Sequence, residues 1–203
     1  MPRTASKTAA IVTAIACAAA GVAWGVRHVG RPKAADGPVI LVSIDTLRAD
    51  HLPIYGYAAV RTPAIDALAA TATVFDRAYS HVPQTLPAHA SILTGELPFQ
   101  TGVRDNVGFT VKDGQWTLAG ALRTRGWATG GFVSAYVLRA ATKINQGFDT
   151  YDADLPAASS ERSLGQVQRD GAQTLDAAER WLAARTGDRV FMFLHFYEPH
   201  KPY

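Results

Sequence analysis

The chain has 203 residues, of which 48% are hydrophobic and 18% are charged, a balance that suits one domain with a substantial core. Its net charge of +3 includes five Lys and Arg side chains within the first 33 residues, so the remainder is close to neutral. A near-neutral remainder excludes a large basic patch, and we therefore expect no nucleic-acid binding.

The N-terminal segment, residues 1–37, is predicted to be a membrane anchor or signal segment followed by a short linker. Residues 9–26 form an uncharged, Ala-rich and mostly apolar run with basic residues on both sides. This run is at the lower edge of the length that spans a membrane, and it is longer than most signal-peptide cores. An uncleaved anchor fits that length better than the alternative, a cleaved signal. Either one predicts a membrane-anchored or secreted protein, with residues 38 onward outside the cytoplasm.

The folded part is predicted to begin at residue 38, with an apolar run at residues 39–42 that leads into Asp45. A continuous apolar run of this kind predicts a strand buried on both faces, as in a parallel sheet. Asp45 would then lie at the C-terminal end of that strand, where open α/β sheets bind their ligands. Taken alone, Asp45 also fits a helix cap for the segment that follows it.

A second motif contains Thr85, Pro87 and His89 and is predicted to open a helix at residues 88–94, which Gly95 ends. A hydroxyl just before the first turn lies where the backbone N–H groups and the helix dipole favour an anion. Taken alone, Thr85 also fits an N-cap residue. Taken together, the carboxylate of Asp45 and the hydroxyl of Thr85 would share one metal ion.

The other elements alternate between helices and strands. Helices are predicted at residues 66–72, 116–125 and 163–185, buried strands at 128–134 and 190–196, and a strand or extended segment at 74–79. This alternation predicts an α/β fold with a largely parallel sheet between helix layers. His195 lies inside the last strand and is interpreted as a core histidine whose ring nitrogens have hydrogen-bond partners.

In series, the motifs of residues 38–203 resemble the sulfatase-like branch of the alkaline phosphatase superfamily. The matching positions are 43–51, 62–66, Thr85, Pro87, 89–91, 93–95, 117–119, 125–127, 146–149, 198–200, 202 and 203. The resemblance implies an alkaline-phosphatase-like α/β fold whose C-terminal part is missing, since further metal ligands of the family lie beyond residue 203. The chain is therefore expected to be an N-terminal fragment or a truncated gene product, which binds metal poorly by itself.

Several residues depart from the sulfatase pattern. Thr85 stands where sulfatases carry a Cys or Ser that is oxidised to formylglycine, and a Thr side chain would not give that aldehyde, so no formylglycine is expected. Thr46 replaces a second metal-binding Asp, and His89 replaces an Arg. Ser134 and Tyr136 stand where an active-site Lys and His would align.

The same residues are also similar to the nucleotide pyrophosphatase/phosphodiesterases, a sister branch with a Thr nucleophile. This resemblance implies that Thr85 is the nucleophile and that Asp45 and Thr85 bind a divalent metal ion, which would be Zn, Ca, Mg or Mn. It also implies that Asn106 donates to a phosphoryl oxygen, although a simple turn residue is the alternative for Asn106. His89 is a second candidate catalytic residue, expected to orient the loop and not to bind metal. His200 is the further candidate for substrate binding.

The predicted function is that of a metal-dependent hydrolase or transferase of sulfate or phosphate esters. The expected substrates are small-molecule, glycan or lipid esters, and the expected membrane contact is made through residues 9–26. The alternative is a truncated, non-catalytic binding module of the same family.

Overall fold

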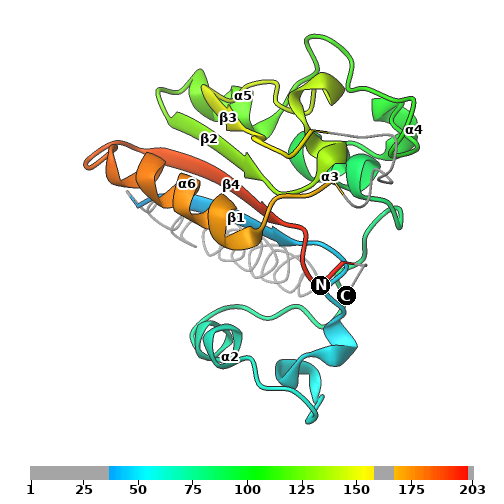
Figure 1. Ribbon diagram of the computed structural model, residues 1–203, viewed down its shortest axis with the longest axis vertical. Helices are drawn as coiled ribbons and strands as arrows, with labels where there is room; N and C mark the ends of the chain where they lie inside the picture. The colour runs from blue at the N-terminus through cyan, green and yellow to red at the C-terminus, as the bar shows by residue number, and fades with distance from the viewer. Residues whose placement is uncertain (1–36, 158–166, 201–203) are drawn as a thin grey trace, which may run out of the picture. The chain divides into compact units, whose positions relative to one another are not determined.

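A computed structural model describes residues 37–157 and 167–200, so the predicted anchor at residues 9–26 lies outside the described part. A four-stranded sheet with the order β1-β4-β2-β3 forms its centre, and all three strand pairs are parallel (Figure 1). The strands are β1 (Val39–Ile44), β2 (Ala128–Val133), β3 (Thr150–Asp152) and β4 (Val190–Phe196). The predicted α/β class with a parallel sheet is confirmed.

The helices are α2 (Pro63–Ala69), α3 (Thr85–Thr94), α4 (Pro98–Thr101), α5 (Leu118–Arg123) and α6 (Gly171–Ala183), with short 3₁₀ turns η1 (Ala49–His51), η2 (Pro53–Tyr55), η3 (Tyr136–Leu138) and η4 (Ala140–Thr142). The helices α3 and α5 pack on one face of the sheet and α6 on the other, whereas α2 packs beside η2. Within residues 37–157 and 167–200, no helix has the length and apolar character needed to cross a membrane.

The two faces of β4 pack into different clusters, because successive side chains of a strand point to opposite faces. Phe191 and Phe193 pack with Leu86 and Leu93 of α3 in one buried cluster. Val190, Met192 and Leu194 point to the other face and pack with Trp181 of α6 in a second cluster. The central strand is therefore buried on both faces, as the apolar run at residues 190–196 predicts.

The strand β1 does not follow the prediction. Its residues Val39, Ile40 and Val42 are 44%, 44% and 49% exposed, although they were expected to be buried on both faces. In the described part of the chain β1 pairs only with β4 and forms an edge of the sheet. Burial of a strand depends on its neighbours, which an apolar run does not reveal.

Helix boundaries also differ from the prediction. The helix α3 starts at Thr85, three residues before the predicted start, and ends as predicted before Gly95. The helix expected at residues 66–72 lies earlier, because Pro63 occupies its first turn, where the missing N–H costs nothing. Residues 74–79 form no strand. The helix α6 starts at Gly171, where Asp170 caps it by accepting a hydrogen bond from the N–H of Ala172.

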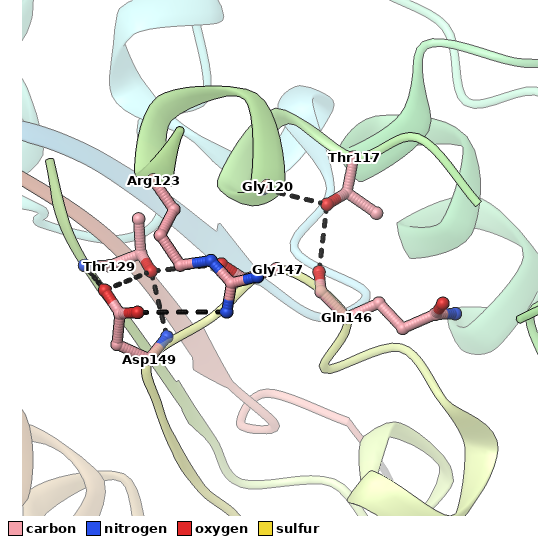
Figure 2. A network of polar contacts seen from close by, with 7 residues as sticks. All are labelled: Thr117, Gly120, Arg123, Thr129, Gln146, Gly147 and Asp149. Atoms are coloured by element: carbon pink, nitrogen blue, oxygen red, sulfur yellow. Dashed lines mark hydrogen bonds and ion pairs between the residues drawn. The ribbon is translucent and has the colours of Figure 1, made fainter. Parts of the chain in front are cut away.

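A network of polar contacts joins α5 and the start of β2 to the loop before β3 (Figure 2). Thr117 caps α5: its hydroxyl accepts a 3.0 Å hydrogen bond from the N–H of Gly120, in the first turn of the helix, and donates one of 2.9 Å to the carbonyl of Gln146. The hydroxyl of Thr129 donates to Asp149 at 3.0 Å. Because these contacts lie at or just before the starts of β2 and β3, they hold the N-terminal end of the sheet, opposite the edge where ligands bind in such folds.

Candidate active site

All five predicted site residues line one recess of about 470 Å³. They are Asp45, Thr85, His89, Asn106 and His200. The recess lies where β1 and β4 end and where α3 begins, at the C-terminal edge of the parallel sheet. A hollow of about 520 Å³ beside α5 has neither a carboxylate nor a His among its lining residues, so it is not the candidate site.

Asp45 extends the pairing of β1 with β4, because its N–H donates a 2.9 Å hydrogen bond to the carbonyl of Phe196. Its carboxylate accepts a 2.9 Å hydrogen bond from the hydroxyl of Thr85, and η1 begins only after Arg48. The helix-cap alternative for Asp45 is therefore wrong. The next residue, Thr46, has a φ of 56°, which is uncommon for a β-branched residue and turns the chain away from the sheet.

The carboxylate of Asp45 is set up to stay ionised. Burial raises the pKa of Asp45, but the contact with His195 and the hydrogen bond from Thr85 lower it by more, so the pKa lies below its ordinary value. Near neutral pH this group is therefore an acceptor of hydrogen bonds and a candidate ligand for a cation.

Thr85 is the first residue of α3 and is only 8% exposed. The N-cap position belongs to Gln84, whose side chain makes no capping bond, so the N-cap alternative for Thr85 is wrong. The N–H of Leu86, in the same turn, donates to Oδ1 of Asn106 at 2.8 Å. Asn106 thus completes the start of α3 from a separate loop, and this contact confirms at least a structural role for its side chain.

His89 connects α3 to β1. Its Nδ1 lies 2.7 Å from the carbonyl oxygen of Thr85 and its Nε2 lies 2.7 Å from Oγ of Ser43. A carbonyl only accepts, so Nδ1 carries the proton and Nε2 accepts from the Ser43 hydroxyl. Burial lowers the pKa of His89 to about 4, and the ring is neutral at pH 7. Both nitrogens are therefore engaged by the protein, which favours the predicted orienting role.

His195 contradicts its interpretation as a satisfied core histidine. It is fully buried, and neither ring nitrogen has a hydrogen-bond partner among the described residues. Its Nε2 lies 3.6 Å from Oδ2 of Asp45, within ion-pair distance. The β1–β4 register places His195 beside Ser43, two residues before Asp45. A His at the end of an otherwise apolar strand was the available signal, but only the register shows which carboxylate it reaches.

A smaller recess of about 210 Å³ opens on another side of Thr85. It shares Asn106 and His200 with the first recess and adds two aromatic side chains, Tyr136 and Tyr197. The ring of Tyr197 stacks on that of His200 with 4.3 Å between centroids. Tyr136 is thus near the site, as its alignment with an active-site residue implies.

Ser134, by contrast, lines neither of the two recesses. Its hydroxyl is buried and forms a 2.8 Å hydrogen bond with the hydroxyl of Thr174 on α6. The position that aligns with an active-site Lys therefore has a structural contact in this chain.

Comparison with known proteins identifies the family. A family model for sulfatases matches residues 38–203. The chain belongs to the sulfatase family. It is 33% identical to arylsulfatase A of Homo sapiens over 97 residues, which are 45% of this chain and 19% of that protein. It is 37% identical to an arylsulfatase of Clostridium perfringens over 57 residues, or 28% of this chain and 12% of that protein.

Solved structures show the same fold. A protein in complex with its substrate D-glucosamine-2-N,6-O-disulfate matches with a TM-score of 0.67 and 21% identity, over 80% of this chain and 34% of that one. Phosphonate monoester hydrolase of Agrobacterium radiobacter matches with a TM-score of 0.65 and 21% identity, over 81% of this chain and 41% of that one. The chain thus spans less than half the length of these sulfatase-like structures, and the predicted alkaline-phosphatase-like fold is confirmed.

Members of the sulfatase family generally depend on a metal ion. The recess offers some, but not all, of the ligands that such an ion needs. Asp45 and Thr85 offer oxygen ligands, which hard divalent cations prefer. Among residues 37–157 and 167–200 no group of three or more His, Cys, Asp or Glu side chains is placed to hold a metal. Since a Zn²⁺ site uses three or four protein ligands, these two residues would provide only a share of the coordination.

Proposed function

We propose that this sulfatase-family chain carries the nucleophile of a metal-dependent hydrolase or transferase of sulfate or phosphate esters. The nucleophile is the hydroxyl of Thr85. The observation that supports this assignment is its 2.9 Å hydrogen bond to the ionised carboxylate of Asp45, in a recess at the C-terminal edge of the sheet. The hydrogen bond orients the oxygen of Thr85, and the first turn of α3 favours an anion beside it.

The reaction proceeds in two displacements. The oxygen of Thr85 loses its proton and bonds to the phosphorus or sulfur atom of the ester, while the bond to the alcohol oxygen breaks and that oxygen takes up a proton. Water or another acceptor alcohol then loses a proton and attacks the same atom. The bond to Thr85 breaks, Thr85 regains its proton, and the phosphate or sulfate leaves free or as an ester of the acceptor. A divalent ion with Asp45 and Thr85 among its ligands would lower the pKa of the hydroxyl and offset the developing charge.

Phosphate esters and diesters are the preferred substrates in this proposal. The hydrate of formylglycine carries a second hydroxyl that can expel sulfate by breaking a C–O bond, and Thr85 has no such group. The threonine-bound intermediate must therefore be cleared by attack on phosphorus or sulfur, which metal ions assist at a phosphoryl group.

The leaving alcohol would occupy the smaller recess beside Thr85. Its aromatic side chains, Tyr136 and Tyr197, suit the ring of an aryl group or a sugar. The match to a structure bound to a disulfated glucosamine supports a glycan ester as one substrate class. Small aryl esters are the practical probes for the same recess.

The test compares aryl phosphate, aryl phosphodiester and aryl sulfate with the same leaving group, with Zn, Mn, Mg or Ca added in turn. The expected result is metal-dependent turnover of phosphate or diester that exceeds turnover of sulfate and is lost in Thr85→Ala. Dominant sulfate turnover, or full activity of Thr85→Ala, would overturn the nucleophile assignment.

A non-catalytic binding module is the second candidate. It is favoured by the missing third metal ligand in the described part of the chain. Binding of inorganic phosphate without turnover of any of the three esters, at every metal tested, would select this alternative.

A further inference from the structure

His195 is a buried polar group that the proposed chemistry leaves without a task. Its side chain is 0% exposed, and neither Nδ1 nor Nε2 has a hydrogen-bond partner within residues 37–157 and 167–200. Buried polar groups in folded proteins are almost always paired, so an unpaired imidazole at the edge of a candidate site calls for a physical reason.

The surroundings of His195 point to one partner. On the face that it shares with Phe193 it packs edge-on against the ring of His89, with 4.9 Å between centroids. The nitrogens of His89 are already bonded to Thr85 and Ser43. The described carboxylate within ion-pair distance of His195 is that of Asp45, 3.6 Å from Nε2.

The two neighbours of Asp45 approach the same oxygen atom. Thr85 donates to Oδ2 at 2.9 Å, and Nε2 of His195 faces Oδ2 at 3.6 Å. Among the described residues Oδ1 has no hydrogen bond, so it stays available for a ligand in the recess. A carboxylate held through one oxygen by the protein has a defined direction for the other.

We propose that His195 is a positioning residue, whose Nε2–H faces Oδ2 of Asp45 across 3.6 Å and holds the carboxylate electrostatically against the hydroxyl of Thr85. The Nε2–H tautomer follows from the geometry, because an unprotonated Nε2 would place its lone pair against an ionised oxygen. Its relevance to turnover rests on the proposed function, whereas the contact with Asp45 does not.

The decisive measurement is the tautomer of His195 in the full chain. The sequence contains six His residues, so long-range ¹H–¹⁵N spectra of labelled protein can be assigned by substituting each one. We expect His195 to carry a proton on Nε2, and we expect this preference to be lost in Asp45→Ala, with His89 as an internal reference that keeps its proton on Nδ1. A proton on Nδ1 of His195, or a spectrum that Asp45→Ala leaves unchanged, overturns the proposal.

Kinetics give a second readout. His195→Leu fills the buried space but cannot donate, and His195→Gln carries an amide N–H that can reach towards Asp45. With KM unchanged, kcat should fall about 10- to 100-fold in His195→Leu and recover largely in His195→Gln, as for other residues that orient a ligand-bearing carboxylate. Equal losses in two folded variants would indicate a packing role alone and contradict the proposal.

The two proposals can fail separately. If Thr85→Ala stays active while the tautomer of His195 depends on Asp45, the nucleophile assignment is wrong and the positioning contact stands. If the tautomer is independent of Asp45, the role of His195 is wrong whatever the turnover of Thr85 variants.

Discussion

The hydroxyl of Thr85 donates a 2.9 Å hydrogen bond to Oδ2 of Asp45, across a separation of 40 residues in the sequence. This contact joins the end of β1 to the start of α3, and it places the proposed nucleophile beside an ionised carboxylate. Taken alone, each residue also fits a helix cap. In the structure neither caps a helix, and the two side chains bond to each other instead.

Substitution of Thr85 should separate chemistry from stability. Thr85→Ala should abolish turnover and lower the free energy of unfolding by only about 1 kcal/mol, since one buried hydrogen bond is lost. Thr85→Ser keeps the hydroxyl and should keep most of the activity. Turnover assays with urea unfolding of the three proteins make the comparison, and an inactive Thr85→Ser that folds normally would count against the hydroxyl as the reacting group.

Asn106 offers a test of substrate binding against a purely structural role. Asn106→Asp keeps an acceptor for the N–H of Leu86 and adds a charge that the start of α3 favours, so its stability should match or exceed that of the wild type. The same change removes an amide donor and should weaken binding of inorganic phosphate at least tenfold. Asn106→Ala should weaken binding and also cost about 1 kcal/mol of stability.

Titration calorimetry and urea unfolding of both Asn106 variants give the two quantities. If phosphate affinity is unchanged in Asn106→Asp, Asn106 does not bind the substrate, and its side chain serves only to complete the start of α3.

The sequence predicts the fold better than it predicts the edges of its elements. The apolar run of β4 and the alternation of strands with helices indicate a parallel sheet, because each pattern reflects burial that repeats along one element. The exposure of β1 and the early start of α3 escape this reasoning. Both depend on contacts between segments far apart in the chain, and Gln84 carries no capping signal that would mark the start of α3.

The site was predictable in its members but not in their contacts. Motif positions bring Asp45, Thr85, His89, Asn106 and His200 to one recess, as expected. The interpretation of His195 fails for a physical reason: whether a buried imidazole has a partner depends on the register between β1 and β4, which no local pattern reports.

Acid should destabilise the chain through His89. The pKa of His89 lies near 4 in the folded protein, mainly because of burial, against about 6.5 in an unfolded chain. The unfolded state therefore binds the proton first. His89 makes its full contribution to the free energy of unfolding above pH 6.5, and about 3 kcal/mol of that contribution is lost as the pH falls to 4.

Urea unfolding in metal-free buffer between pH 7.5 and 4 measures this loss, with His89→Gln as the control. The control should be less stable at pH 7.5 and show a shallower decline. Parallel declines in the two proteins would show that other groups cause the acid sensitivity.

The location of the protein remains a prediction, and we propose attachment to a membrane through residues 9–26 with residue 38 onward outside the cytoplasm. Cell fractionation should recover the full chain with membranes, and protease added from outside the cytoplasm should digest the folded part. Replacing two residues of the apolar run by Lys, for example Ile11 and Ile15, should release the chain, because charges inside a membrane segment are costly. Wild-type chain found soluble in the cytoplasm would contradict the proposal.

Two glycines with the same backbone angle form a matched pair for testing how α5 packs on the loop before β3. Gly147 and Gly187 both have a φ of 92°, but a Cβ on Gly147 would collide with the N–H of Gly120 and lie 2.6 Å from Oγ1 of Thr117, whereas nothing lies within 4 Å of a Cβ on Gly187 (Figure 2). Gly187→Ala should cost about 1–2 kcal/mol of stability for the backbone alone. Gly147→Ala should cost about 1–3 kcal/mol more, because the contact between two backbones cannot relax by rotation of a side chain. Urea unfolding of both variants measures the difference, and equal costs would show that α5 moves away from this loop without penalty.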